Sequence, residues 1–332
     1  MNVDAKSNKI DRSLLPLHVG YKETKPTLCI GLDIAWFGGS KKDPNSRHDF
    51  IAIVLVDSQM KVTDVEYLRV PLIDHDLDAK QTAAALNRLI KKYDLEGRRI
   101  VIAVDAPLQA EPRNLPVRKS VPGKGEVQRR ACEEYLSCKR MGIDVAKGGA
   151  NGWHPNIQPG APLAPRVQNL LTELGGNFKL WTRETAEHKK LIIECFPAEA
   201  IWAAKRIGWF PPDINAIQAK AYKNQKGKQL TAQEVMDLVE TILLPFAKVC
   251  GENHWKDHVV TKVIEHILRD NVARWKTGEH FSGGKLIDDV VDSMICVATA
   301  IAYATNNAHV WQDLNHPDDG HIIGPGNMQE LL

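Results

Sequence analysis

Residues 27–36 read Thr27-Leu-Cys-Ile-Gly-Leu-Asp33-Ile-Ala-Trp36, an apolar run that carries a single carboxylate near its end. Pro26 precedes the run, and Gly38-Gly39-Ser40 follows it shortly afterwards. Such a run between chain breakers predicts a strand covered on both faces, as in the interior of an α/β sheet. An ionised Asp inside that strand would lose its hydration at a high cost. We therefore expect Asp33 to lie where the strand meets a cleft and to face a partner there.

The residues that follow predict a mixed sheet flanked by helices. Residues 50–56 and 62–70 are two further strand patterns joined by a short turn, so three consecutive antiparallel strands are expected. Residues 80–93 have apolar side chains at helical spacing and lead into the apolar run 99–104. This order predicts a helical crossover to a strand that lies parallel to the first. The fold class is therefore α/β.

Acidic residues close the buried strands and open the last long helix. Asp105 ends the strand at 99–104, so it should share one edge of the sheet with Asp33. Glu194 ends the apolar run 191–193, and Phe196-Pro197 would stop that strand. A mostly apolar helix is expected over 286–304, and three acids lie in its first turns. These are Asp288, Asp289 and Asp292, of which the last two are three residues apart and share a helical face.

Each acid alone is explained more simply as a turn or cap former. Carboxylates that converge on one site, however, repel one another strongly without a cation. Ligation by carboxylate oxygens suits Mg²⁺ or Mn²⁺, and one or two such ions can activate water and stabilise the leaving oxygen of a phosphodiester. The acids together predict a site for one or two ions of this kind.

The opening β-β-β-α-β order, the Glu194-Cys-Phe-Pro197 strand end and the Asp289-Val-Val-Asp292 helix resemble one family. This is the domain of unknown function 429 family, whose members are predicted RNase H-like nucleases, and the resemblance spans residues 27–325. It implies an RNase H-like fold with metal ligands on three elements. These ligands are Asp33, Asp105 and either Asp289 or Asp292, with Glu194 as a further candidate; the Asp288-Asp289 doublet leaves the helical ligand open.

Two basic segments are candidates for contact with a phosphate backbone. Residues 111–140 contain more basic than acidic side chains and lie next to the Asp105 strand end. Residues 220–228 contain four lysines with no acid between them, although a solvated helix face explains this run equally well. The candidate substrate-binding residues are Arg129, Arg130, Lys223, Lys226 and Lys228. No pattern selects DNA over RNA.

The chain divides into a core with an arm and an insertion. The core is expected over 27–210 and 281–326, the arm over 1–26, and a helical insertion or lid over 211–280. A capping-box pattern at Thr231-Ala-Gln-Glu234 begins the first helix of that insertion. The formal net charge of +2 is too small to indicate nucleic-acid binding by itself. The six cysteines form no CxxC pair, which suits reduced thiols and suggests no zinc site.

A cytoplasmic protein is expected, because residues 1–25 contain no continuous apolar h-region and no uncharged stretch elsewhere reaches the roughly 18 residues of a membrane span. The apolar insertion helices leave a homodimer open. The leading hypothesis is a metal-dependent nuclease in which Asp33 bridges two ions, Asp105 and an acid of the last helix hold one each, and Glu194 binds an ion or orients water. A non-catalytic nucleic-acid or protein-binding module is one alternative. An actin-like or sugar-kinase-type phosphotransferase is the other, disfavoured because Ile34-Ala-Trp-Phe37 separates Asp33 from the following glycines.

Overall fold

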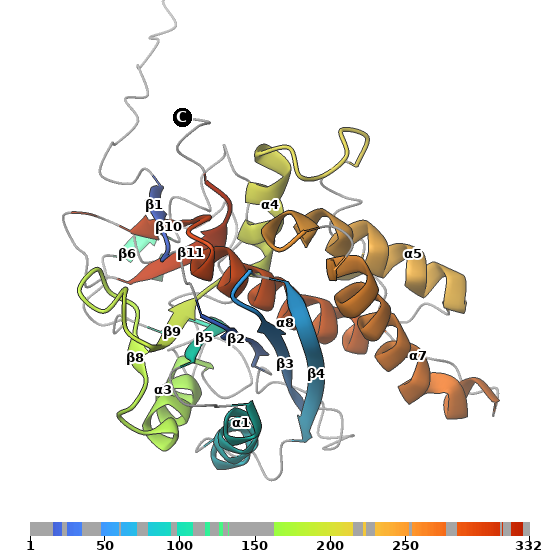
Figure 1. The fold of residues 1–332 in the computed structure, drawn as a ribbon, viewed down its shortest axis with the longest axis horizontal. Coiled ribbons are helices and arrows are strands. Elements are labelled where there is room, and N and C mark those ends of the chain that lie inside the picture. Colours follow the sequence, from blue (N-terminus) through green and yellow to red (C-terminus); the bar gives the residue numbers. More distant parts are fainter. Residues whose placement is uncertain are drawn as a thin grey trace, which may run out of the picture.

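The computed structural model describes the following parts of the 332-residue chain. They are residues 16–21, 25–34, 48–59, 61–71, 79–93, 98–108, 117–119, 126–128, 132, 163–214, 222–223, 230–251, 254–276, 284–312, 314 and 320–327. Within them, a mixed sheet of six strands is flanked by helices on both faces (Figure 1). No helix among these residues is both long enough and apolar enough to cross a membrane.

The main sheet contains the strands that the sequence predicts, in an order that places the first of them near its centre. The order across the sheet is β4 (Val62–Pro71), β3 (His48–Val56), β2 (Thr27–Asp33), β5 (Arg99–Asp105), β9 (Lys190–Glu194) and β8 (Lys179–Leu180). Strands β2, β3 and β4 are antiparallel neighbours, and β5 lies parallel to β2. Strands β9 and β8 continue the parallel half. The expected three antiparallel strands followed by a parallel one are confirmed.

Helices cover the two faces of this sheet in separate groups. The helix α1 (Lys80–Tyr93) has the predicted bounds and packs with α3 (Leu163–Leu174) over one face. The long helix α8 (Gly284–Ala304) crosses the other face over β2, β5 and β3 (Figure 1). Its residues after the first turn are almost all buried, which matches the apolar pattern from which it was predicted.

Side chains of β2 alternate between these two layers. Leu28, Ile30 and Leu32 belong to the apolar cluster on the side of α1 and α3. Cys29 belongs to the cluster on the side of α8, so Gly31 and Asp33 share that side. A Cβ atom on Gly31 would overlap the Ser293 carbonyl oxygen of α8. The absence of a side chain at residue 31 is therefore what allows α8 to lie against the strand.

The helices of the predicted insertion form part of the layer around α8. They are α5 (Ala232–Leu243), η6 (Leu244–Val249), the π-helical η7 (Trp255–Val260) and α7 (Thr261–Lys276). Thr231 and Glu234 form the predicted capping box at the start of α5. Trp255 is fully buried and donates a hydrogen bond to the Leu243 carbonyl oxygen at 2.7 Å. These residues belong to the same apolar cluster as α8 and the sheet, in contrast to a lid that packs separately.

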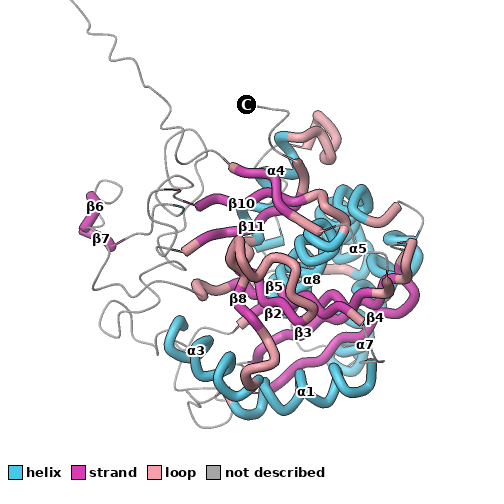
Figure 2. The backbone as a smooth tube through the Cα atoms, turned by 60° about the vertical axis from the view of Figure 1, so that its left-hand side comes forward, coloured by secondary structure: helices cyan, strands magenta, loops and turns pink. Residues whose placement is uncertain are grey.

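A second sheet of three antiparallel strands lies beside the first (Figure 2). It consists of β1 (Leu17–Val19), β10 (Ala308–Gln312) and β11 (His321–Pro325), with β10 in the middle. The arm predicted over 1–26 contributes β1 to this sheet. A separate pair of short strands, β6 (Val117–Lys119) and β7 (Glu126–Gln128), forms a hairpin.

A buried polar network joins the second sheet to α4 (Pro197–Arg206). Glu199 of α4 is fully buried, and its Oε1 atom lies 2.7 Å from His309 Nε2 and 2.9 Å from Trp311 Nε1. His309 Nδ1 is 2.8 Å from the Gly326 carbonyl oxygen. Because a carbonyl oxygen can only accept, His309 donates from Nδ1 in this hydrogen bond.

A second buried ion pair fixes α3 to the sheet edge near Asp33. Arg166 and Asp49 are 1% and 0% exposed, and their side chains make two parallel hydrogen bonds of 2.7 and 2.5 Å. Thr82 of α1 donates a third hydrogen bond to Asp49 at 2.5 Å. Asp49 is next to Phe50, which is the partner of Asp33 in the β2–β3 register. Both helices of this layer are thus connected to the strand beside Asp33.

Replacement of Gly31 by Ala should destabilise the fold by about 1–3 kcal/mol or more, because the added methyl group meets backbone atoms of α8 that have no room to move. Gly176→Ala is the matched control, since a Cβ there would have no neighbour within 4 Å. The free energy of unfolding in urea measures both changes. Equal stability of the two variants would contradict the close packing of α8 on β2.

Arg166→Ala should cost about 3–5 kcal/mol of stability, because it leaves the Asp49 carboxylate buried without its cation. The exposed pair Lys92–Glu66 provides the comparison: its atoms are also close, at 2.6 Å, but the Lys92 side chain is 58% exposed. Lys92→Ala should cost about 1 kcal/mol or less. Urea unfolding of both variants tests this order, and a larger loss for Lys92→Ala would overturn it.

Candidate functional site

Asp33 and Asp105 lie side by side at the carboxyl ends of adjacent parallel strands. The register of β2 and β5 makes them direct partners, and their preceding residues pair without a shift. Val101 and Ala103 of β5 belong to the cluster on the side of α8, so alternation places Asp105 on that side together with Asp33. Both side chains are partly exposed. The structure therefore brings together the two strand acids that the sequence predicts.

The first turns of α8 lie near these two acids because α8 runs antiparallel to β2. At the far end of α8, the Tyr303 hydroxyl donates to the Ala186 carbonyl oxygen at 2.7 Å, and the Tyr303 ring lies near Arg99, the first residue of β5. The opposite end of the helix is thus beside the carboxyl ends of β2 and β5. Cys296 of α8 is also close enough to these acids to be affected by their charges. Burial raises the pKa of its thiol well above its usual value, and the negative charges of Asp105 and Asp33 raise that pKa further.

Asp292 is the acid of α8 whose contacts are best defined. Its side chain is almost fully buried, and each carboxylate oxygen accepts a hydrogen bond. The Tyr222 hydroxyl donates to Oδ1 at 2.7 Å, and the Lys223 ammonium donates to Oδ2 at 2.6 Å. Lys223 Nζ is also 3.5 Å from Asp288 Oδ1. A lysine of the basic run 220–228 therefore forms ion pairs with two of the predicted acids.

The surroundings of Lys223 favour its charged form. Burial lowers the pKa of this amine, but the negative charges of Asp292, Asp288 and Asp105 outweigh burial and hold the pKa well above its usual value. About a third of the side-chain surface is exposed. Burial and the Asp292 charge also raise the pKa of the neighbouring Tyr222 hydroxyl, which stays protonated and donates. Within the part of the chain that the structure describes, Lys223 thus places a fixed positive charge beside these carboxylates.

Asp289 lies three residues before Asp292, on the same face of α8. Its side chain is partly exposed, whereas that of Asp292 is almost fully buried. The two acids between which the sequence could not choose therefore differ in burial, and Asp292 is the one that accepts hydrogen bonds from Tyr222 and Lys223.

Glu194 lies on the other face of the sheet from Asp33 and Asp105. In the β5–β9 register its partner is Val104, which belongs to the cluster on the side of α1 and α3. Its side chain is 3% exposed, and Oε2 accepts a hydrogen bond from the Leu108 backbone N–H at 2.9 Å. Gln168 of α3 donates to the Leu108 carbonyl oxygen at 2.6 Å. Glu194 therefore supports the segment after Asp105, and the structure does not bring it to the other acids.

Four of the five predicted substrate-binding residues lie outside the described residues. These are Arg129, Arg130, Lys226 and Lys228, so only Lys223 can be placed. The role of Tyr222 and the pairing of Asp288 were not predicted. Tyr222 and Lys223 are neighbours in the sequence, but no local pattern connects them to α8. Lys223 and Asp292 are 69 positions apart.

The strand acids fit a hard divalent cation by donor type. No group of three or more His, Cys, Asp or Glu side chains within the described ranges is arranged to hold a metal ion. Mg²⁺ is usually bound by one or two carboxylates, with water and substrate phosphate as its other ligands. The pair Asp33 and Asp105 matches that requirement, and Asp292 already has a cation as its partner.

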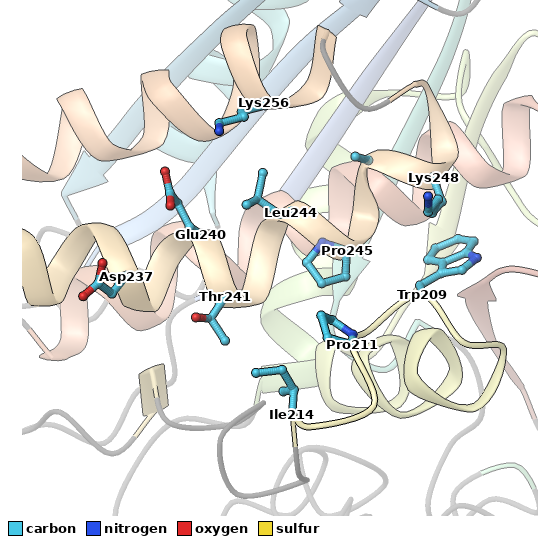
Figure 3. Close-up of a pocket in the computed structure, with 11 residues that line it drawn as sticks. Trp209, Pro211, Ile214, Asp237, Glu240, Thr241, Leu244, Pro245, Lys248 and Lys256 are labelled. Atoms are coloured by element: carbon cyan, nitrogen blue, oxygen red, sulfur yellow. The ribbon is translucent and has the colours of Figure 1, made fainter.

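A separate cavity of about 680 Å³ lies in the helical layer (Figure 3). The floor includes Leu244 and Pro245, with Trp209 at one end. Glu240 of α5 and Lys256 of η7 come from two different helices that line it (Figure 3). Its lining, taken over the described residues, includes none of the acids that follow the strands or open α8.

Comparisons with known proteins add no relative. A scan against protein-family models finds none that matches this chain, and a search of the curated proteins finds no significantly similar sequence.

Proposed function

We propose that this protein is a divalent-metal-dependent nuclease that hydrolyses phosphodiester bonds of nucleic acid, with an RNase H-like core. The observation that carries the proposal is the direct pairing of Asp33 and Asp105, at the carboxyl ends of adjacent parallel strands and on the face that α8 covers. The β-β-β-α-β order on which the family resemblance rests agrees with the arrangement of β2, β3, β4, α1 and β5.

In this proposal Asp33 and Asp105 hold Mg²⁺ or Mn²⁺. The ion supplies an activated water and stabilises the charge on the leaving oxygen. The chain contributes the position of the two carboxylates, since β2 and β5 are held between two apolar clusters. Glu194 and Gln168 fix the backbone at Leu108, which keeps the end of β5 in place.

One observation favours the alternative of a non-catalytic binding module. Asp292 is neutralised by Lys223 and hydrogen-bonded by Tyr222, so one of the predicted metal ligands has protein partners. A binding module would keep its affinity for nucleic acid when the strand acids are neutralised. A nuclease would keep affinity but lose turnover, because the ion would lose its ligand.

Asp33→Asn and Asp105→Asn should each reduce Mn²⁺-dependent cleavage of nucleic acid by about a hundredfold or more, because a neutral amide stabilises the cation far less than a carboxylate does. The assay is cleavage of fluorescent single-stranded, hybrid and branched substrates, with binding followed by fluorescence anisotropy. Asp213→Asn, at an exposed position, is the matched control and should retain full activity.

Cleavage that persists at the normal rate in both variants would overturn the assigned site. Binding without cleavage by the unaltered protein, over the whole substrate panel and with either ion, would identify a binding module instead. Thermal unfolding of each variant verifies that a loss of activity is not a loss of fold.

A further inference from the structure

The position of Lys223 bears on how many metal ions the site can hold. We infer that the Lys223 ammonium takes the place of one divalent ion, so that the site binds a single ion at Asp33 and Asp105. This inference rests on the proposed function and goes beyond it, because the acids alone are equally compatible with one or two ions.

The first argument is the direct contact of Lys223 with the carboxylates of α8. The ammonium is 2.6 Å from Asp292 Oδ2 and 3.5 Å from Asp288 Oδ1. The remaining oxygen of Asp292 accepts the Tyr222 hydroxyl at 2.7 Å. A second ion that used Asp292 would have to share a carboxylate oxygen with one of these donors. It would also meet the positive charge of Lys223 at short range.

The second argument is the burial of Asp292. Its side chain is 6% exposed, so the carboxylate has almost no access to bulk water and depends on protein partners. Lys223 and Tyr222 satisfy both oxygens, and the charge of Asp105 also acts favourably on the Lys223 ammonium. The buried carboxylate of Asp292 therefore has its counter-charge within the chain.

The third argument is the contrast with the two strand acids. Asp33 and Asp105 are more exposed than Asp292, and they lie side by side with like charges. Two adjacent carboxylates are stabilised more by a doubly charged cation than by a singly charged one. A lysine carries a single charge and has three N–H donors. The strand pair is thus the part of the site that suits a metal ion, and the pair Asp288 and Asp292 is the part that suits an ammonium group.

The test is the number of Mn²⁺ ions bound by the full chain. Isothermal titration calorimetry gives the stoichiometry, and the electron paramagnetic resonance signal of free Mn²⁺ measures it independently. The unaltered protein should bind one ion. Lys223→Met should bind two, because Asp292 and Asp288 then lack their cation. Lys223→Gln should also bind two and is the variant to use if the methionine variant does not fold, since the amide can still donate to Asp292.

Three control variants complete the set. Lys223→Arg keeps the positive charge and should bind one ion. The double variant Lys223→Met with Asp292→Asn lacks both charges and should also bind one. Lys262→Met removes an exposed lysine that pairs with Glu265 at 3.4 Å on α7, and it should leave the stoichiometry at one.

The remaining outcomes distinguish a failure of this inference from a failure of the proposed function. Two ions in the unaltered protein, or one ion in both neutral Lys223 variants, would overturn the role of Lys223 and leave the proposed nuclease intact. No bound Mn²⁺ in any variant would overturn the inference and the metal-dependent function together. Loss of binding in Asp33→Asn, with retention in the unaltered protein, assigns the single ion to the strand pair.

Discussion

The close approach of α8 to β2 at Gly31 is the constraint on which the site depends. A side chain at residue 31 would overlap the backbone of α8 at Ser293, so the helix can lie this near only because the residue is glycine. At the same time, the antiparallel course of α8 places its first turns beside the ends of β2 and β5. One packing contact in the middle of the strand thus determines where the acids of α8 stand relative to Asp33 and Asp105.

The opposite layer fixes the sheet edge from the other face. Arg166 and Thr82 hold Asp49 next to the residue that pairs with Asp33, and Glu194 with Gln168 holds the backbone just after Asp105. The hydrogen bonds among these groups are directional. Their geometry would be lost if one partner shifted. Two groups of contacts consequently position the strand acids. One is the apolar packing of α8 on one face of the sheet, and the other is the set of polar contacts near the strand ends on the opposite face.

Many helices and strands can be predicted from patterns within a few neighbouring residues. The features that cannot be predicted in this way depend on contacts between residues far apart in the sequence. The strand runs, the periodicity of α1 and the capping box at Thr231 give the elements because each signal lies within a few residues. The face on which Glu194 lies depends on register: it pairs with Val104 rather than Asp105, one residue out of step, and no short turn connects those parallel strands. The strand β10 and the contact of Lys223 with Asp292 likewise depend on partners far away in the sequence.

The arrangement of charges allows the chain to fold without a bound metal ion. Carboxylates near one another destabilise a fold unless something neutralises them. On α8 the ammonium of Lys223 supplies that neutralisation within the chain, and its pKa is held high by the same acids, so the pairing persists at neutral pH. The strand acids are more exposed than Asp292, so water screens their charges more effectively. The chain can therefore fold before an ion binds, because the contact between Asp292 and Lys223 needs no metal.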